Sequence, residues 1–232
     1  SVEAVTSAFS WVYLIVVIAF FTWLFMAGQW TKEERKRLIV IVVLFAGAAV
    51  FWSAFEQAAS TLNLFAAQNT RNSIFGWTFP SSWFQSVNAL MIIIFAPVFA
   101  WIWISLGKRD PSSPAKFAFG LVSVGLGFVV KVGAAQASAN WVLVSSLWLV
   151  LTYLLHTIGE LSLSPVGLSS MTKLAPDRVK GMMMGVWFLA ASVGNLIAGG
   201  VLRFYADFTL PQVFGAVAAF AIIAGLVMFA LV

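Results

Sequence analysis

The feature that most constrains this chain is a series of seven long apolar segments separated by short polar turns. A helix needs about 20 predominantly apolar residues to cross the hydrocarbon core of a bilayer. The residues are 62% hydrophobic and only 9% charged, a balance that no water-soluble domain of this size requires. The sequence therefore predicts an all-α transmembrane protein. We expect its spans at 9–28, 38–69, 82–106, 117–135, 141–172, 181–203 and 211–232.

The charged residues show a preference for one side of the predicted membrane. Lysine and arginine are frequent in alternate turns and rare in the turns between them. The basic turns are 31–37, 107–116 and 173–181. Cytoplasmic loops of membrane proteins are enriched in these residues. We therefore expect a multi-pass protein of the cell (inner) membrane, with the first residue of this sequence outside and the last residue in the cytoplasm.

Several kinds of chemistry are excluded or disfavoured by composition. The chain has no cysteine, which excludes disulfides, thiol catalysis and Cys-ligated metals. It has one histidine and no local cluster of carboxylates, so no metal site and no cofactor are expected. Its basic residues lie in short loops, a pattern unlike a nucleic-acid surface. The sequence begins without an initiator Met or a signal peptide, so we expect a fragment that starts within a longer protein.

Polar residues recur at intervals of four within the fifth expected span. They are Thr152, His156, Glu160 and Ser164. This spacing places them on one slowly drifting face of a helix. Burying a carboxylic acid in lipid is costly, so an intramembrane glutamate faces protein or water and is a functional candidate. Pro165 removes a backbone hydrogen bond close to this acid, which predicts a kink.

A second intramembrane acid, Glu56, lies in the second expected span. Trp52, Ser60 and Asn63 share its helical face by their spacing. If Glu56 and Glu160 face one cavity, they can bind protons or a cationic group. Protonation of a buried carboxylate removes a charge, which is the physical basis of a proton-coupled switch. The alternative is that each glutamate makes only a structural hydrogen bond.

The remaining polar and small residues of the spans have simpler interpretations. We interpret His156 as a structural residue that hydrogen-bonds between helices. Lys131 is predicted to extend its amine to the membrane interface. Close helix contacts are predicted at a group of glycines in the fourth span. These are Gly120, Gly125, Gly127 and Gly133.

Four sequence blocks in order resemble helices of the proton-dependent oligopeptide transporter family. FWSAFEQAASTLNLFA (51–66) and WFQSVNALMIIIFAPVFA (83–100) resemble its seventh and eighth helices. GELSLSPVGLSSMTKLAP (159–176) and GMMMGVWFLAASVGN (181–195) resemble its tenth and eleventh. The resemblance covers nearly the whole chain. It implies the C-terminal six-helix half of a major facilitator fold, preceded by one linker transmembrane helix of the bacterial type.

The resemblance also implies a domain organisation and an activity. Residues 1–30 would be the linker transmembrane helix and residues 31–232 the six-helix transporter bundle. The N-terminal six-helix half of the same protein would be missing from this sequence. The complete protein would be a proton-coupled symporter that imports di- and tripeptides by alternating access. Its partners would be these peptides, protons, the lipid bilayer and the missing half, without nucleic acid.

Six residues match positions that bind substrate in the family. They are Trp52, Glu56, Asn88, Glu160, Ser164 and Trp187. Glu160 would meet the peptide amino terminus, and Glu56 would also couple the proton. Asn88 would hydrogen-bond the peptide, and Trp187 would form the wall of a side-chain pocket.

The outer end of the second span departs from the family pattern. Members often carry an acid there that pairs with a basic residue of the N-terminal half, whereas this chain has Gln68 and Asn69. A neutral hydrogen bond would then replace the salt bridge.

Other functions remain open from the sequence. A related transporter of nitrate or another small nitrogenous solute is the first alternative. A structural or assembly subunit of a membrane complex is the second, and it would need no polar face towards a water-filled cavity. An intramembrane hydrolase would need a nucleophile and a base, for which Ser162 or Ser164 near His156 is a weak candidate without an orienting acid. Transport is favoured, and enzymatic activity is not expected.

Overall fold

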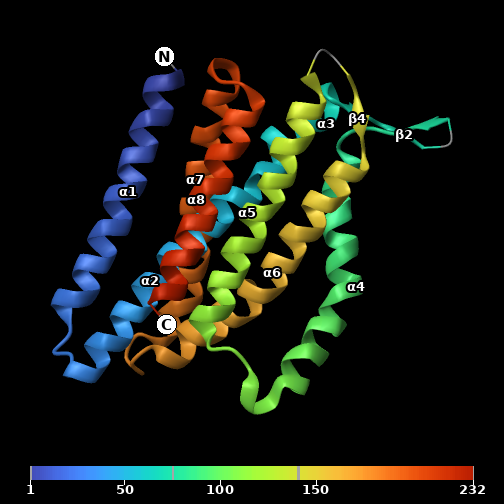
Figure 1. Cartoon of the computed structure of the whole chain (residues 1–232). Coiled ribbons are helices and arrows are strands. Elements are labelled where there is room, and N and C mark those ends of the chain that lie inside the picture. The colour runs from blue at the N-terminus through green and yellow to red at the C-terminus, as the bar shows by residue number, and fades with distance from the viewer. Residues whose placement is uncertain (1, 75, 140–141, 232) are drawn as a thin grey trace.

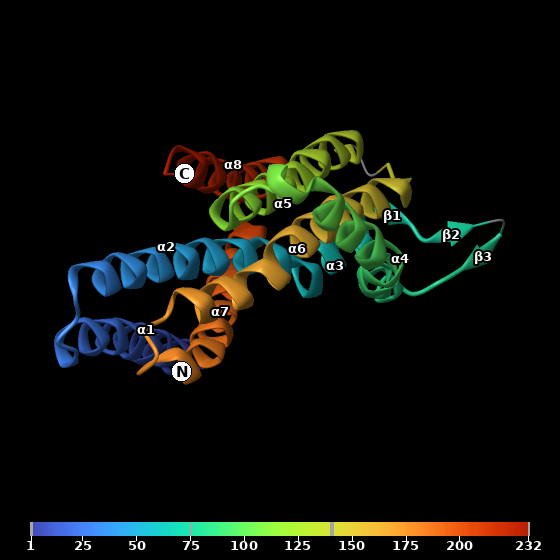
Figure 2. The same cartoon turned by 90° about the horizontal axis from the view of Figure 1, so that it is seen from below.

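The computed structural model describes residues 2–74, 76–139 and 142–231 and is almost entirely helical (Figures 1 and 2). Its long helices run roughly side by side. They are α1 (Val2–Ala27), α2 (Lys32–Phe55), α3 (Thr61–Gln68), α4 (Trp83–Leu106), α5 (Ser113–Ala137), α6 (Leu147–Leu174), α7 (Met183–Asp207) and α8 (Leu210–Ala230). Within the described residues, seven helical segments are long and apolar enough to cross a membrane, with α2 and α3 forming one of them. The predicted all-α transmembrane fold class is confirmed.

The bundle is organised around α5, which packs along both α6 and α8. Helix α2 packs mainly on α7, and α4 packs on α6 at one edge of the bundle. Helix α1 lies at the opposite edge, where it touches α7 (Figure 1). Because α2, α4 and α6 lie close together, polar residues on these helices can meet at one place.

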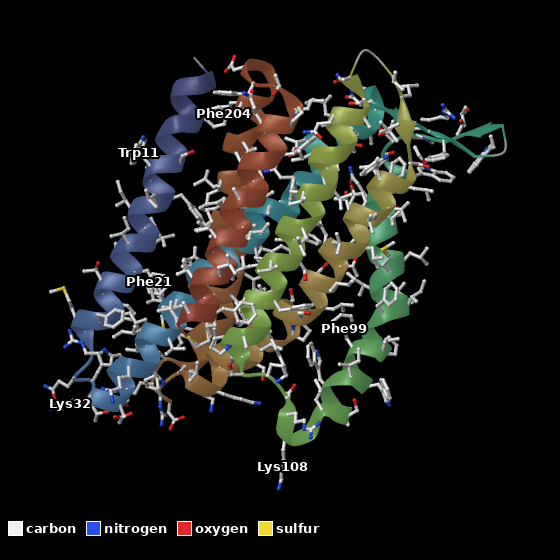
Figure 3. The ribbon with its side chains drawn as sticks, in the orientation of Figure 1. Trp11, Phe21, Lys32, Phe99, Lys108 and Phe204 are labelled. Carbon is white, nitrogen blue, oxygen red and sulfur yellow. The ribbon has the colours of Figure 1, made fainter. Side chains whose placement is uncertain are left out.

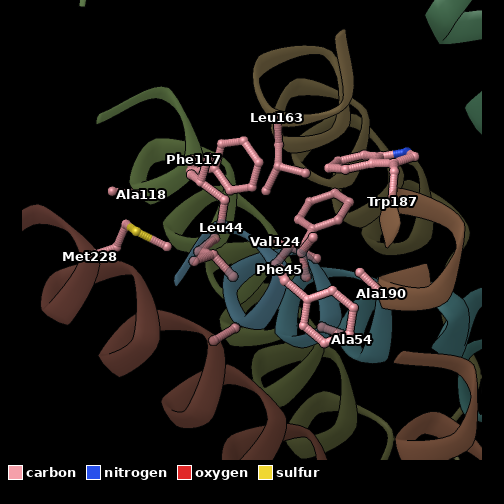
Figure 4. Packing of buried hydrophobic residues seen from close by; sticks show 14 of the residues in the cluster. Leu44, Phe45, Ala54, Phe117, Ala118, Val124, Leu163, Trp187, Ala190 and Met228 are labelled. Atoms are coloured by element: carbon pink, nitrogen blue, oxygen red, sulfur yellow. The ribbon is translucent and has the colours of Figure 1, made fainter. Parts of the chain in front are cut away.

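Large apolar side chains from different helices fill the interior. Leu44 of α2, Phe117 of α5 and Leu163 of α6 are fully buried, and Trp187 of α7 packs among them (Figure 4). Many apolar side chains also lie on the outside, such as Ile104, which is 79% exposed. An apolar exterior of this extent is what a lipid-facing surface requires.

Close contact between α5 and α6 depends on two facing glycines. A Cβ atom added at Gly120 would lie 2.9 Å from the carbonyl oxygen of Gly159. A Cβ added at Gly159 would lie 2.8 Å from the carbonyl oxygen of Gly120. Any side chain here would push the two backbones apart, which agrees with the packing role predicted for Gly120.

We expect Gly120→Ala to destabilise the complete protein by about 1–3 kcal/mol, the usual cost of overpacking. The matched control is Gly185→Ala in α7, because no atom lies within 4 Å of a Cβ added there. Thermal unfolding of the purified protein in detergent measures the difference. A midpoint for Gly120→Ala equal to that of the control would contradict the predicted contact.

One end of the bundle carries the basic turns. Lys32 and Lys108 both lie at this end (Figure 3). Thr31 and Glu34 form a capping box at the start of α2, with the backbone N–H of Thr31 donating to the Glu34 carboxylate at 2.8 Å. The guanidinium of Arg178, between α6 and α7, lies 3.9 Å from the Glu34 carboxylate. The turns before α2 and before α7 are therefore joined.

The other end carries four short strands. Three lie in the segment predicted as a turn after the second span, whereas the fourth, at 144–145, lies within the predicted fifth span (141–172), whose helix α6 begins only at Leu147. The four strands are β1 (Thr70–Arg71), β2 (Ser73–Ile74), β3 (Trp77–Thr78) and β4 (Val144–Ser145). Strand β1 pairs in parallel with β4, and β2 pairs antiparallel with β3. Gly76 lies at the hairpin turn with φ +82°, a conformation that favours glycine.

The second span differs from its prediction. The sequence pattern predicts one helix over 38–69, but α2 ends at Phe55 and a short 3₁₀ turn, η1 (Glu56–Ala59), separates it from α3. The prediction of one continuous helical face for Trp52, Glu56, Ser60 and Asn63 is therefore wrong beyond Glu56. The break could not be predicted from the sequence, because 51–69 contains neither proline nor glycine.

Lys131 also differs from its prediction. Its side chain is fully buried, so it does not extend to the interface. The Nζ atom lies 3.3 Å from the ring centroid of Phe65 in α3 and 5.5 Å from that of Phe214 in α8. Lys131 lies on the face of α5 that is turned to these helices, where the aromatic rings attract its ammonium group.

Candidate functional site

A small cavity lies where η1, α4 and α6 come together. Its volume is about 160 Å³, and its polar lining consists of Glu56, Gln85, Asn88, Tyr153 and His156. Glu56 enters it from the turn that interrupts the second span. Asn88 enters from α4, one turn after the start of that helix. The cavity therefore brings together residues from three separate parts of the sequence.

The second acid is joined to this cavity through Asn88. The amide nitrogen Nδ2 of Asn88 donates to Oε2 of Glu160 at 3.1 Å. Asn88 thus lines the cavity beside Glu56 and also binds Glu160. Glu56 lines the cavity, and Glu160 is linked to its lining through Asn88, so the facing of both acids into one cavity stays a hypothesis.

Thr157 determines how the Asn88 amide is oriented. Its hydroxyl lies 2.6 Å from Oδ1 of Asn88 and 2.8 Å from the carbonyl oxygen of Tyr153. A hydroxyl has one proton, so it donates to only one of these oxygens at a time. When Asn88 Oδ1 accepts this proton, the NH₂ group of the amide must face Glu160. Thr157 therefore positions Asn88, and Asn88 positions the acid.

The two acids lack a positive partner within the described part of the chain. Glu56 and Glu160 are both partly buried, and neither forms an ion pair there. A carboxylate removed from water without a cation is costly. Binding a proton or a ligand with an amino group removes this cost. The site is therefore chemically suited to protons and to cationic groups.

Two further predicted residues supply unused hydrogen-bonding atoms. Nε1 of Trp52 is buried and has no hydrogen-bond partner in the described residues, and the same holds for Oγ of Ser164. The ring centroids of Trp52 and Phe55 lie 5.3 Å apart, and Phe55 immediately precedes Glu56 in the sequence. Ser164 follows Glu160 by one helical turn of α6. Both can donate to a ligand or to a neighbouring protein surface.

Trp187 lies apart from the residues that line the cavity. It is only 6% exposed and packs edge-to-face on Phe117, with ring centroids 6.3 Å apart. Gly167 of α6 leaves the space that its indole ring fills. The structure thus brings Glu56, Asn88 and Glu160 together, and it places Trp187 in the apolar interior.

His156 is buried, and neither of its nitrogens has a hydrogen-bond partner of good geometry among the described residues. The ring nevertheless has a polar contact with the backbone of Val124 in the neighbouring helix α5. The ring lies 5.1 Å from that of Phe128 and 6.1 Å from that of Phe55, and Gly127 leaves room for it. The hydrogen bond predicted between helices therefore stays a prediction.

Sequence reasoning missed Gln85, Tyr153 and Thr157. Thr157 precedes Glu160 by three residues, so helical spacing could have found it. Gln85 and Tyr153 had no comparable signal. No group of three or more His, Cys, Asp or Glu close enough to hold a metal occurs in the described segments.

A bundle of membrane-spanning helices with one acid in a cavity and a second acid hydrogen-bonded to its lining has the features of a membrane transporter. The chain belongs to the POT family, whose family model matches residues 4–230. The expected family resemblance is confirmed. The protein is therefore a multi-pass membrane protein of a transporter family.

Several known proteins are similar to the chain. It is 48% identical over 194 residues to the peptide transporter YePEPT of Yersinia enterocolitica subsp. palearctica serotype O:3 (strain YE-P4), with 81% of this chain and 38% of that protein covered. It is 33% identical over 219 residues to the di-/tripeptide transporter of Lactococcus lactis subsp. cremoris, with 93% of this chain and 44% of that protein covered.

A solved structure gives the same fold. The crystal structure of the peptide transporter POT in complex with sulfate superposes with a TM-score of 0.93 at 39% identity, covering 100% of this chain and 47% of that one. The chain therefore spans less than half the length of the relatives it matches.

Proposed function

We propose that the complete protein is a proton-coupled symporter that imports di- and tripeptides by alternating access. Residues 31–232 would form its C-terminal six-helix bundle and residues 1–30 its linker helix. A six-helix N-terminal half would complete the cavity. The carrying observation is that Asn88 lines a cavity together with Glu56 and hydrogen-bonds to Glu160, while neither acid forms an ion pair within the described residues. The names of the relatives in Yersinia and Lactococcus support peptides as the substrate.

Each site residue has a proposed role. The peptide amino group would pair with Glu160, which Asn88 holds in place, and Asn88 would also reach the peptide. Glu56 would bind the transported proton. Trp52 and Ser164 would donate hydrogen bonds to the ligand from their free polar atoms. Trp187 would support the wall of a side-chain pocket from the interior.

Alternating access requires helices that can bend. Pro97 lies inside α4 and Pro165 inside α6, the two helices that carry Asn88 and Glu160. Each proline removes one backbone hydrogen bond. Substrate or proton would shift the equilibrium between inward- and outward-open states only through different affinities for the two.

The proposed setting is the cell (inner) membrane, with the lipid bilayer around the apolar exterior. The basic turns that hold Lys32 and Lys108 would face the cytoplasm. The first residue of this sequence would then lie outside and the last residue inside.

No enzymatic role is proposed. A serine hydrolase would need a base next to its nucleophile. The hydroxyl of Ser162 instead donates to the carbonyl oxygen of Ile158 at 2.8 Å. Oγ of Ser164 has no hydrogen-bond partner within the described segments, so neither serine pairs with His156.

Competition for binding tests the proposed substrate. The purified complete protein is first allowed to bind a labelled dipeptide. Unlabelled di- and tripeptides should then displace this ligand. Tetrapeptides and nitrate should compete poorly. Displacement by nitrate at concentrations similar to those of dipeptides would instead favour a transporter of a small nitrogenous solute.

We expect Thr157→Val to weaken dipeptide binding by about tenfold, because the amide of Asn88 loses the bond that orients it towards Glu160. Thr172→Val is the matched control, since the Thr172 hydroxyl binds only the carbonyl of Leu168 in the same helix, at 2.8 Å. Isothermal titration of both variants measures the difference. Equal affinities would show that Asn88 needs no support from Thr157.

A further inference from the structure

The break between α2 and α3 has no proline or glycine to explain it. Sharp breaks in helices usually occur at such residues or where a side chain inserts into the hydrogen-bond ladder. Here Phe55 ends α2, and Ser60, with φ −118° and ψ −96°, separates η1 from α3. Glu56, the proposed proton site, is the first residue of the intervening turn. The cause of the break therefore bears on the proton site.

The side chain of Gln57 is the inserted group. It is fully buried. Its Nε2 atom donates to the carbonyl oxygens of Ser53, at 3.1 Å, and Ala198, at 3.4 Å. Its Oε1 atom accepts from the hydroxyls of Ser60, at 3.3 Å, and Thr61, at 2.9 Å. A glutamine amide has two N–H donors and room for two hydrogen bonds at its oxygen, so this amide is fully used.

These four bonds join three segments of the bundle. Ser53 belongs to α2, Ser60 and Thr61 mark the start of α3, and Ala198 belongs to α7. The bond to Ser53 is made to the carbonyl that precedes Gln57 by one helical turn. The Gln57 side chain thus forms hydrogen bonds on both sides of the break, to the end of α2 and to the start of α3.

The hydrogen bond to the Ala198 carbonyl holds the turn against α7, which cannot move closer to α2. One turn earlier in α7, a Cβ added at Gly194 would lie 2.8 Å from the backbone nitrogen of Ser53. The backbones of α2 and α7 are therefore already in contact just before the break. The angle of the turn is set relative to this firm contact.

We propose that Gln57 is the positioning residue for Glu56: its buried amide holds the turn that directs the Glu56 carboxyl into the cavity beside Asn88. This inference rests on the proposed role of Glu56 in proton coupling. Without the amide, four polar partners would each lose a hydrogen bond or the segment would revert to a regular helix. Either change reorients the residue next to Gln57.

Transport by Gln57→Met tests the functional part. Methionine fills a similar volume and makes none of the four hydrogen bonds. Peptide uptake driven by a proton gradient should fall about tenfold because buried partners are lost, while peptide counterflow without a gradient should be retained. Gln136→Met, at an exposed position near the end of α5, is the matched control. Added to Glu56→Gln, the substitution should cause no further loss, because both act through one group.

The reactivity of an introduced thiol tests the geometry without transport. This chain has no cysteine, so Glu56→Cys can be made in a complete protein freed of other cysteines. Adding Gln57→Met should slow modification by a membrane-impermeant thiol reagent, and adding Gln136→Met should not. If thiol reactivity changes as expected but the wild type moves no peptide with protons, the positioning role stands and the proposed function fails.

Two results would overturn the positioning role. One is unchanged thiol reactivity in the Gln57→Met background. The other is a parallel loss of gradient-driven uptake and counterflow, which general structural damage would cause. If Gln57→Met does not reach the membrane, Thr61→Val decides the question, because it removes one of the four bonds and keeps the side-chain shape. It should shift both readouts in the same direction by a smaller amount, and no shift would refute the inference.

Discussion

Glu56→Gln in the complete protein should abolish peptide uptake driven by a proton gradient and leave peptide counterflow intact. Glutamine keeps the size of the side chain and its hydrogen bonding but cannot bind and release a proton. Gradient-driven uptake should fall by about tenfold or more, equivalent to at least about 1.4 kcal/mol in the effective barrier. Counterflow exchanges peptide without net proton movement, so it does not need the proton site.

The control for this substitution is Glu33→Gln. Glu33 lies at the exposed start of α2, where its carboxylate lies 3.1 Å from the amine of Lys36. An exposed ion pair of this kind contributes little, about 0–1 kcal/mol, so both forms of transport should be normal. If Glu56→Gln still accumulates peptide in response to the gradient, Glu56 is not the coupling residue.

Glu160→Gln should selectively weaken the binding of peptides that have a free amino terminus. The side chain keeps its position, because its amide oxygen can still accept from Asn88 Nδ2, now 3.1 Å from the carboxylate. It loses the charge that would pair with the peptide ammonium. Loss of one partner of a buried charge pair costs about 2–5 kcal/mol, so we expect an affinity decrease of at least about 30-fold.

A peptide with a blocked amino terminus provides the internal control for Glu160→Gln. An N-acetylated dipeptide has no ammonium group, so its weak binding should be the same for wild type and variant. Binding of both peptides can be measured by displacement of one labelled ligand. Equal affinities of wild type and variant for the free peptide would remove Glu160 from substrate recognition.

The membrane spans could be predicted from the sequence because a bilayer selects helices by a simple property, about 20 apolar residues in a row. The two acids were equally visible, since a charge in such a run is rare. The sequence pattern did not show that the two acids lie close to each other in the fold. Asn88 and Glu160 are 72 residues apart, and only the family resemblance connected them.

What the sequence could not predict depends on side chains that act across helices. The break after Phe55 comes from the Gln57 amide, whose bond to Ala198 spans 141 residues. Lys131 was placed at the interface because its position in the span favours it. The rings of Phe65 and Phe214, on two other helices, hold the Lys131 amine in the interior instead. Helical spacing alone carries no information on which neighbour a face will meet.

The central claim, proton-coupled peptide import, is tested most directly by uptake into proteoliposomes that contain the complete protein. With a pH gradient, acidic outside, a labelled dipeptide should accumulate above its external concentration and the vesicle interior should acidify with it. Without the gradient, the peptide should only equilibrate. Peptide accumulation that does not depend on the pH gradient, or peptide entry without acidification of the vesicle interior, would contradict the account.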